Sequence, residues 1–291
     1  MSTIHIPVLV DEVLRFINFE KGVLVDCTFG GGGHTKIILD SFEGISVIGI
    51  DQDEDAVGKG LELKSIYGHR LKLYRENFRN VDLVLKQEGL ESVNFFLLDL
   101  GVSSDLLADE ERGFSFMKSG PLDMRMDKSS EITAAFVVNT YPKERLADLF
   151  YKYGEETLSR RIAKAIVEYR KKKKIETTDE LAKIIKGCAP KRQKIHPATR
   201  VFQALRIYIN DELGALEEFL SKSLNFLTSG GRIGVITFHS LEDRMVKNFF
   251  RLKEKEGVLK VLTKKPITPS EQEIKFNPRS RSSKLRVGEK I

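Results

Sequence analysis

The sequence is poor in cysteine and has no long apolar run. Cys27 and Cys188 are its only cysteines, and they lie far apart along 291 residues. Such a pair is more typical of reduced packing residues than of a disulfide, and it cannot by itself hold a zinc ion. Because no apolar run approaches the roughly 20 residues that a membrane helix needs, we expect no membrane segment.

The first residues also lack the pattern of a secretory leader. MSTIHIPVLVDEVL has no basic segment followed by a long apolar one, so we expect a cytoplasmic protein. The composition, with 41% hydrophobic and 31% charged residues, is ordinary for a soluble protein. At a prior of ~150 residues per domain, the length predicts two domains.

Positive charge is concentrated in one window. Residues 160–206 contain 15 Lys or Arg against 4 Asp or Glu, a net charge of +11, whereas the rest of the chain carries −5. A concentrated basic segment indicates a surface for phosphate groups, although a solvated helical face is the alternative. Within this window, KKKK (171–174) is expected to be a solvated helix end.

Short apolar runs alternate with helical patterns in the first hundred residues and return near the end. Strands of a parallel sheet with helices on both faces, a doubly wound α/β fold, are therefore expected. The expected strands are 23–29, 46–51, 70–76, 94–100, 232–238, 258–263 and 284–288.

Between these two groups of strands, from Glu131 to about Phe226, the period is helical. TTDEL (177–181) offers a capping box, Pro197 suits the first turn of a helix, and Ser240 with Asp243 suits the start of another. We predict a sheet domain of residues 1–108 and 216–291, interrupted between its fourth and fifth strands by a helical domain of residues 109–215.

Four glycines follow the first expected strand, in VLVDCTFGGGGHT (23–35). A glycine loop lets a ligand approach the backbone at the start of the next helix. The dinucleotide fingerprint fails because Thr35 or Lys36 stands where its third Gly or Ala is needed, and no Gly-Lys-Ser/Thr follows for a phosphate loop. Acids end neighbouring strands at Asp26, Asp51 and Asp99, which suits S-adenosylmethionine with its ammonium group and ribose diol.

Motifs along nearly the whole chain make the pattern specific. Together they closely resemble the RsmH family, also called MraW, bacterial S-adenosylmethionine-dependent methyltransferases that modify the N4 amine of a cytidine in 16S ribosomal RNA. The motifs are HIPVL (5–9), DCTFGGGGHT (26–35), GIDQD (49–53), DLGVSS (99–104), ERGFSF (111–116), GPLDMRMD (120–127), HPATRVFQALRIYIN (196–210), FHSLEDR (238–244) and NPRSRSSKLR (277–286).

The resemblance implies a class I, Rossmann-like methyltransferase domain with a helical insertion that recognises substrate. It also implies contacts with the cofactor. These are Gly32, Gly33 and His34 in the glycine loop, Asp51 on the ribose, Phe78 beside the adenine and Asp99 near the methionine end. We add Asp26, because it ends the first strand at the same edge of the sheet. One position departs from the family pattern: Leu106 stands where members often have Gln. A modest loss of cofactor affinity is expected from it.

For the chemistry, hydrogen-bond acceptors aimed at the cytosine N4 amine would stabilise its developing positive charge. Asp99 is the first candidate and Asp123 the second, and no metal is required. Since a reacting base must be unpaired or splayed, stacking rings and cations are expected to hold the RNA. The candidates are Phe114, Phe116, Arg200, Arg206, His239, Arg279, Arg281, Lys284 and Arg286.

Three other interpretations remain open from the sequence. The acceptor could be DNA or protein, because the cofactor loop does not choose it. A non-catalytic RNA-binding factor and a nicotinamide dehydrogenase are the other two. The favoured partner is the small ribosomal subunit with its 16S RNA, and oligomeric state is not predicted.

Overall fold

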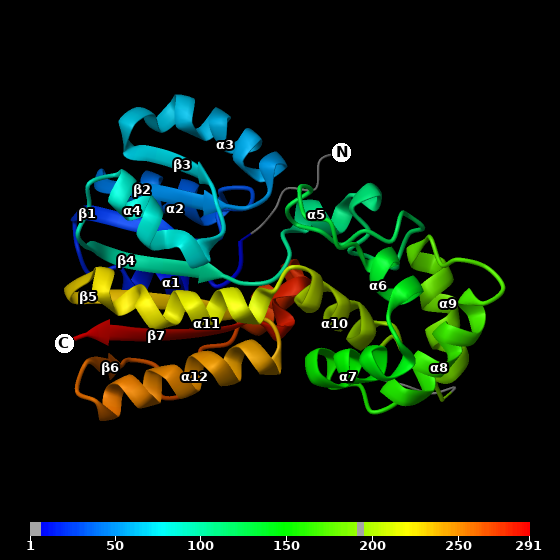
Figure 1. The fold of residues 1–291 in the computed structure, drawn as a ribbon. Helices are drawn as coiled ribbons and strands as arrows, with labels where there is room; N and C mark the ends of the chain where they lie inside the picture. The colour runs from blue at the N-terminus through cyan, green and yellow to red at the C-terminus, as the bar shows by residue number, and fades with distance from the viewer. Residues whose placement is uncertain (1–6, 191–194) are drawn as a thin grey trace. The chain divides into compact units, whose positions relative to one another are not determined.

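The computed structural model describes residues 7–190 and 195–291. The chain forms two compact units, one of Met1–Gly101 with Leu213–Ile291 and the other of Val102–Glu212 (Figure 1). The boundaries expected from sequence, after residues 108 and 215, lie a few residues beyond these. We call the first the sheet unit and the second the helical unit.

A single seven-stranded sheet organises the sheet unit, in the order β3-β2-β1-β4-β5-β7-β6. The pairs among β1 to β5 are parallel, and β7 is antiparallel to both β5 and β6. All seven strands predicted from sequence are present, with ends that differ by a few residues. They are β1 (Lys21–Asp26), β2 (Gly44–Asp51), β3 (Leu71–Arg75), β4 (Val93–Asp99), β5 (Leu227–Thr237), β6 (Leu259–Val261) and β7 (Lys284–Lys290).

Helices cover both faces of this sheet, which confirms the doubly wound α/β fold. Phe96 and Leu98 of β4 pack in a core with α4, α11 and α12, whereas Phe95 and Leu97 pack in a second core with α1 and α2. Because successive side chains of a strand point to opposite faces, a strand buried on both sides must be apolar throughout. The helices of this unit are α1 (Val10–Phe16), α2 (Gly33–Ser41), α3 (Glu54–Tyr67), α4 (Val81–Gln87), α11 (Glu212–Ser223), α12 (Ser240–Lys255) and α13 (Glu271–Phe276).

Short 3₁₀ turns connect several of these elements. They are η1 (Gly68–Arg70), η2 (Phe78–Asn80), η4 (Leu224–Phe226) and η5 (Pro278–Ser282), together with η3 (Glu110–Arg112) in the helical unit.

Two predicted strands extend beyond the observed ones. The predicted strand 94–100 ends one residue after β4, and the predicted strand 23–29 runs past the end of β1 into the glycine loop.

The helical unit has its own apolar core, to which its helices contribute buried faces. Thr177 caps α9 with Glu180 in the predicted capping box. The prediction that Pro197 lies in the first turn of a helix is wrong. The helix α10 begins at Thr199, with Ala198 as its N-cap. Its helices are α5 (Ser104–Ala108), α6 (Ala134–Thr140), α7 (Lys143–Gly154), α8 (Ser159–Arg170), α9 (Thr178–Cys188) and α10 (Thr199–Ile209).

The exposed lysines 171–174 follow the end of α8, as predicted for a solvated helix end. Cys27 and Cys188 are both buried and free. Across residues 7–190 and 195–291, no helix combines the length and apolar character needed to span a bilayer.

Candidate functional site

The glycine loop between β1 and α2 is held by neighbouring strands. The amide of Cys27 donates to Leu97 of β4 at 2.8 Å, and the amide of Phe29 donates to Ile50 of β2 at 2.9 Å. Gly32 adopts a φ of 72° and is the N-cap of α2. A Cβ at this position would lie 2.5 Å from the side chain of Leu63 and 2.7 Å from the ring of Phe29. Both the left-handed backbone and the close packing therefore require glycine here.

Asp51, at the end of β2, ties the glycine loop to the next strand. One carboxylate oxygen accepts from the amide of Gly30 at 2.7 Å, and the other accepts from the amide of Asp53 at 2.9 Å. Burial raises the pKa of Asp51 to about 6, against the lowering effect of these two hydrogen bonds. An acid held in this way at a strand end can accept from a ligand hydroxyl with its remaining lone pairs.

Asp26, at the end of β1, lies deeper. It is 2% exposed and accepts from the hydroxyl of Thr35 at 2.7 Å. Burial raises its pKa, and the hydrogen bond from Thr35 opposes that rise. The carboxylate thus joins β1 to the first turn of α2 through one of its oxygens, and a direct cofactor contact at Asp26 stays a prediction.

His34 and Asp99 form a close pair at the same edge of the sheet. Nε2 of His34 lies 3.5 Å from Oδ2 of Asp99, and the side chains are 7% and 17% exposed. The hydroxyl of Thr28 accepts from the backbone amide of Asp99 at 2.6 Å and fixes the end of β4. Burial alone would lower the pKa of His34, but the Asp99 carboxylate outweighs it and the pKa is raised.

Phe78 begins η2, directly after β3 and Asn77. Its ring is half-buried and meets the ring of Phe219 edge to face, with centroids 5.9 Å apart. Asn77 accepts from the amide of Arg79 and caps this turn. Phe78 thus stands at the carboxyl end of the sheet, at the edge where Asp51 and Asp99 also end their strands.

Asp123, the second catalytic candidate, has a structural partner. Its two oxygens accept from Nε and Nη2 of Arg125 at 2.8 and 2.7 Å. Burial alone would raise the pKa of Asp123, but Arg125 outweighs it and lowers the pKa. Both oxygens are engaged within the helical unit, so this geometry does not favour the predicted role as acceptor for an amine.

The two candidate stacking rings of the helical unit differ. Phe114 is 7% exposed and belongs to the apolar core, which corrects its assignment as a stacking ring. Phe116 is half-buried and already stacks on His196, with centroids 4.5 Å apart. His196 and Arg200 line a pocket of about 260 Å³ in this unit.

Two of the predicted phosphate-binding arginines are committed to ion pairs. Nε and Nη2 of Arg206 donate to Glu212 at 2.7 and 2.9 Å. Arg286 on β7 is 5% exposed and donates to Asp243 of α12 from Nε at 2.7 Å. These pairs argue against both assignments, because an arginine satisfied by a carboxylate in a bidentate pair is a poor phosphate donor.

The remaining predicted cations are more accessible. Arg200, Arg279 and Arg281 are exposed. The ammonium of Lys284 lies 3.6 Å from Asp243, and its side chain is 40% exposed. Exposed basic side chains are therefore found in each unit.

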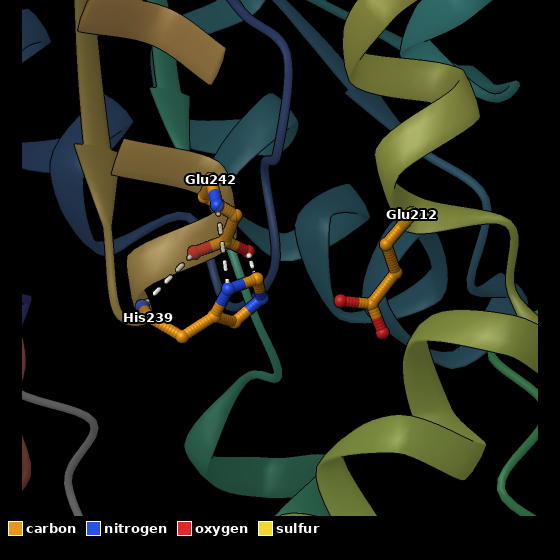
Figure 2. A group of neighbouring side chains, drawn as sticks. All are labelled: Glu212, His239 and Glu242. Carbon is orange, nitrogen blue, oxygen red and sulfur yellow. Dashed lines mark hydrogen bonds and ion pairs between the residues drawn. The ribbon is translucent and has the colours of Figure 1, made fainter. Parts of the chain in front are cut away.

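His239 caps a helix instead of facing substrate, which corrects two expectations. It is the N-cap of α12, where Nδ1 accepts from the amide of Glu242, and the Glu242 carboxylate accepts in return from the amide of His239 (Figure 2). Nε2 of His239 also lies 3.1 Å from Glu242 Oε1, and the imidazole is 7% exposed. Ser240 is thus the first helical residue and not the cap, and Asp243 pairs with Arg286 instead of closing the box. His5, assigned no role from sequence, lies outside the described residues.

Comparison with known proteins decides the family. The family model described as the MraW methylase family matches residues 2–291. A protein of Carboxydothermus hydrogenoformans named Ribosomal RNA small subunit methyltransferase H is 48% identical over 309 residues, covering 100% of this chain and 99% of that protein. One of the same name from a Hydrogenobaculum species is 50% identical over 284 residues, covering 97% and 94%.

The chain belongs to the MraW methylase family. It is therefore a methyltransferase, and its sheet unit is a class I, Rossmann-like methyltransferase fold. The resemblance predicted from sequence motifs is confirmed.

The structure shows the environment of Leu106, the residue that differs from the family pattern. Leu106 lies on α5, is 7% exposed and packs in the core of the helical unit. A buried leucine side chain offers no hydrogen bond, so it cannot make the polar contact that the resemblance implies for Gln at this position.

Several supporting residues were not identified from sequence. Thr28 and Thr35 hold Asp99 and Asp26, and Arg125 holds Asp123. Both threonines belong to the motif DCTFGGGGHT. Their hydroxyl groups, in a loop that follows a strand-end acid, were the sequence signal that could have predicted this supporting role. Nothing local marks the pair of Arg286 with Asp243, which are 43 residues apart, and the pair of Arg206 with Glu212, six residues apart, was also not predicted.

Proposed function

We propose that this methyltransferase transfers a methyl group from S-adenosylmethionine to the N4 amine of a cytidine in the 16S RNA of the small ribosomal subunit. The observation that carries the proposal is the match of the whole chain to the MraW methylase family and to relatives named as small-subunit ribosomal RNA methyltransferases. A cytoplasmic location follows from such a substrate.

The residues of the sheet unit suit this cofactor. Asp51, held by two backbone amides, would accept from the ribose hydroxyls, and the ring of Phe78 would lie beside the adenine. Asp99 Oδ1 is buried and makes no hydrogen bond with the described residues, so an ammonium group could satisfy it. Gly32 keeps side-chain atoms out of the loop at the start of α2. When bound, the cofactor supplies an electrophilic methyl group on a sulfonium.

Asp99 is also the better of the two candidate acceptors for the cytosine amine. The nitrogen lone pair is conjugated with the ring, so an acceptor on its N–H bond favours the pyramidal form and stabilises its growing positive charge. A carboxylate oxygen has two lone pairs and can accept from an ammonium group and an amine together. Asp123 is the weaker candidate because the Arg125 guanidinium pairs with both of its oxygens and lowers its pKa against the effect of burial, which makes it a poorer acceptor.

RNA would be held by cations on each unit separately. Arg200 lines the pocket of the helical unit, and Arg279, Arg281 and Lys284 lie on the last segment of the sheet unit. Phosphate contacts of this kind give affinity and position without reading sequence. Phe116 could offer an edge to a base beside His196, whereas Phe114 is left out of the RNA surface.

Methyl transfer to different acceptors tests the proposal. The protein is incubated with labelled S-adenosylmethionine and, in parallel, with small ribosomal subunits lacking the modification, genomic DNA and a protein extract. Label is expected in the RNA of the subunits. Label in DNA or protein alone would contradict the proposed acceptor, and protection from heat by NAD but not S-adenosylmethionine would contradict the cofactor.

A further inference from the structure

Two buried polar atoms at the ends of β4 and the glycine loop make no hydrogen bond with the described residues. They are Nε2 of His34 and Oδ1 of Asp99. A buried polar atom left without a partner costs roughly 1–3 kcal/mol, so each such atom needs an explanation, of which a missing ligand is one. Both belong to one pair, because His34 Nε2 faces the other Asp99 oxygen, Oδ2, at 3.5 Å.

The surroundings of the pair hold both residues in place. The backbone amide of Asp99 is held by Thr28, and His34 is the second residue of α2, whose first turn is tied to Asp26 through Thr35. The charged groups that act on His34 are Asp99 on β4, Asp26 on β1 and Glu273 on α13, all acidic. These acids raise the pKa of His34 against the lowering effect of burial, and Nε2 faces Oδ2 while Oδ1 makes no hydrogen bond with the described residues.

We infer that His34 is a positioning residue: its imidazole holds Oδ2 of Asp99, so that Oδ1 is presented to the ammonium group of the cofactor's amino-acid end. The inference rests on the proposed function, since it takes S-adenosylmethionine as the cofactor. His34 acts through Asp99, and its side chain need not touch the cofactor.

This arrangement makes a distinction among ligands. S-adenosylhomocysteine keeps the amino-acid end, whereas 5′-methylthioadenosine keeps the adenosine and lacks the amino-acid end. Loss of the pair of His34 and Asp99 should weaken the binding of S-adenosylhomocysteine and leave the binding of 5′-methylthioadenosine unchanged. Loss of Asp51, which would contact the ribose, should weaken both.

The experiment measures the affinity of both ligands by calorimetry for the full chain and its variants. His34→Ala should weaken binding of S-adenosylhomocysteine by a few fold, because it removes the ion-pair contact of Nε2 with Asp99 at 3.5 Å. His34→Gln, which keeps a donor, should recover most of that affinity. Asp99→Asn should cost at least about tenfold, and His34→Ala added to Asp99→Asn should cost little more.

His69→Ala is the matched control, because His69 is an exposed histidine of η1 in the same unit. It should bind both ligands as the wild type does. The inference is overturned if His34→Ala leaves S-adenosylhomocysteine binding unchanged, if its effect adds fully to that of Asp99→Asn, or if 5′-methylthioadenosine weakens equally. Failure of the wild type to bind either ligand would instead contradict the proposed cofactor, so the two failures are distinguishable.

Discussion

Charged groups are held in opposite ways in two regions of this protein. At the carboxyl ends of the strands, Asp51 is held by two backbone amides, with no cation engaged in either hydrogen bond. On the outer strands, Arg286 is held by the carboxylate of Asp243. Backbone amides fix a carboxylate without neutralising it, whereas a bidentate ion pair uses up the charge of both partners. The first arrangement keeps charge for a ligand, and the second uses charge for stability.

The same contrast divides the arginines. Arg206 and Arg286 are paired with acids, but Arg200 and Arg281 are exposed. Four predictions, from the largest expected effect to the smallest, sharpen or break this division.

Gly32→Val should destabilise the protein most. The added side chain meets Leu63 and Phe29 below van der Waals distance at a φ of 72°, which we expect to cost about 3 kcal/mol or more and to abolish cofactor binding. Urea denaturation measures the first effect and calorimetry the second. Gly58→Ala is the control, because a Cβ there meets nothing within 4 Å, and it should be neutral or stabilising. Equal losses for both variants would contradict the argument.

Arg286→Ala should leave the half-buried Asp243 with only the more distant Lys284, 3.6 Å away, as its cation. We expect a loss of about 3 kcal/mol in the free energy of unfolding, and little change in RNA affinity per folded molecule. Burial alone would raise the pKa of Asp243, but Arg286 outweighs it and lowers the pKa. The variant with both Asp243→Leu and Arg286→Met should recover most of the stability. If the single variant folds normally but loses RNA, Arg286 belongs to the RNA surface after all.

Asp51→Asn should affect binding and stability with opposite signs. Cofactor affinity should fall by about tenfold, because a ribose acceptor is weakened. The native pKa of about 6 lies above the ordinary value of 3.8, so the stability contributed by protonated Asp51 is full below pH 4 and lost as pH rises through about 6. At pH 7.5 the unliganded variant should therefore be more stable than the wild type, by an amount on the order of 1 kcal/mol. Thermal melts between pH 4 and 8 measure this, and unchanged cofactor affinity would refute the ribose assignment.

Arg200→Ala and Arg281→Ala should each weaken RNA binding by only a few fold, with a salt dependence reduced by about one phosphate contact. Melting temperature and cofactor affinity should not change. Arg206→Ala is the informative comparison, since its arginine is paired with Glu212 and the variant should lose stability with little loss of RNA affinity. Filter binding at several salt concentrations measures the RNA affinity of each variant. If Arg206→Ala lost RNA affinity while Arg200→Ala and Arg281→Ala did not, the division between paired and exposed arginines would be wrong.

The sheet and its ligand edge were predictable because they depend on local pattern. A run such as Phe95–Leu98 is apolar throughout only in a strand buried on both faces, and acids directly after such runs must meet at one edge of a parallel sheet. Gly32 could be placed because a left-handed turn demands its residue type.

The partners of side chains could not be predicted in the same way. Whether Arg286 meets a phosphate or Asp243 depends on packing between segments 43 residues apart, which no local pattern records. The cap of α12 was assigned one residue late because serine is a better N-cap by preference than histidine, yet the box between His239 and Glu242 satisfies the same backbone groups. For a related reason, the pattern located Asp26 at the strand end but did not predict the hydroxyl of Thr35 that donates to one of its oxygens.

The most direct test of the account identifies the methylated nucleoside. Small subunits from a strain lacking this protein are incubated with labelled S-adenosylmethionine and either the wild type or Asp99→Asn, and the RNA is digested to nucleosides and separated. We predict label in N4-methylcytidine with the wild type and a large loss with the variant. Label in another nucleoside, or none in RNA from a protein that binds the cofactor, would contradict the proposed reaction.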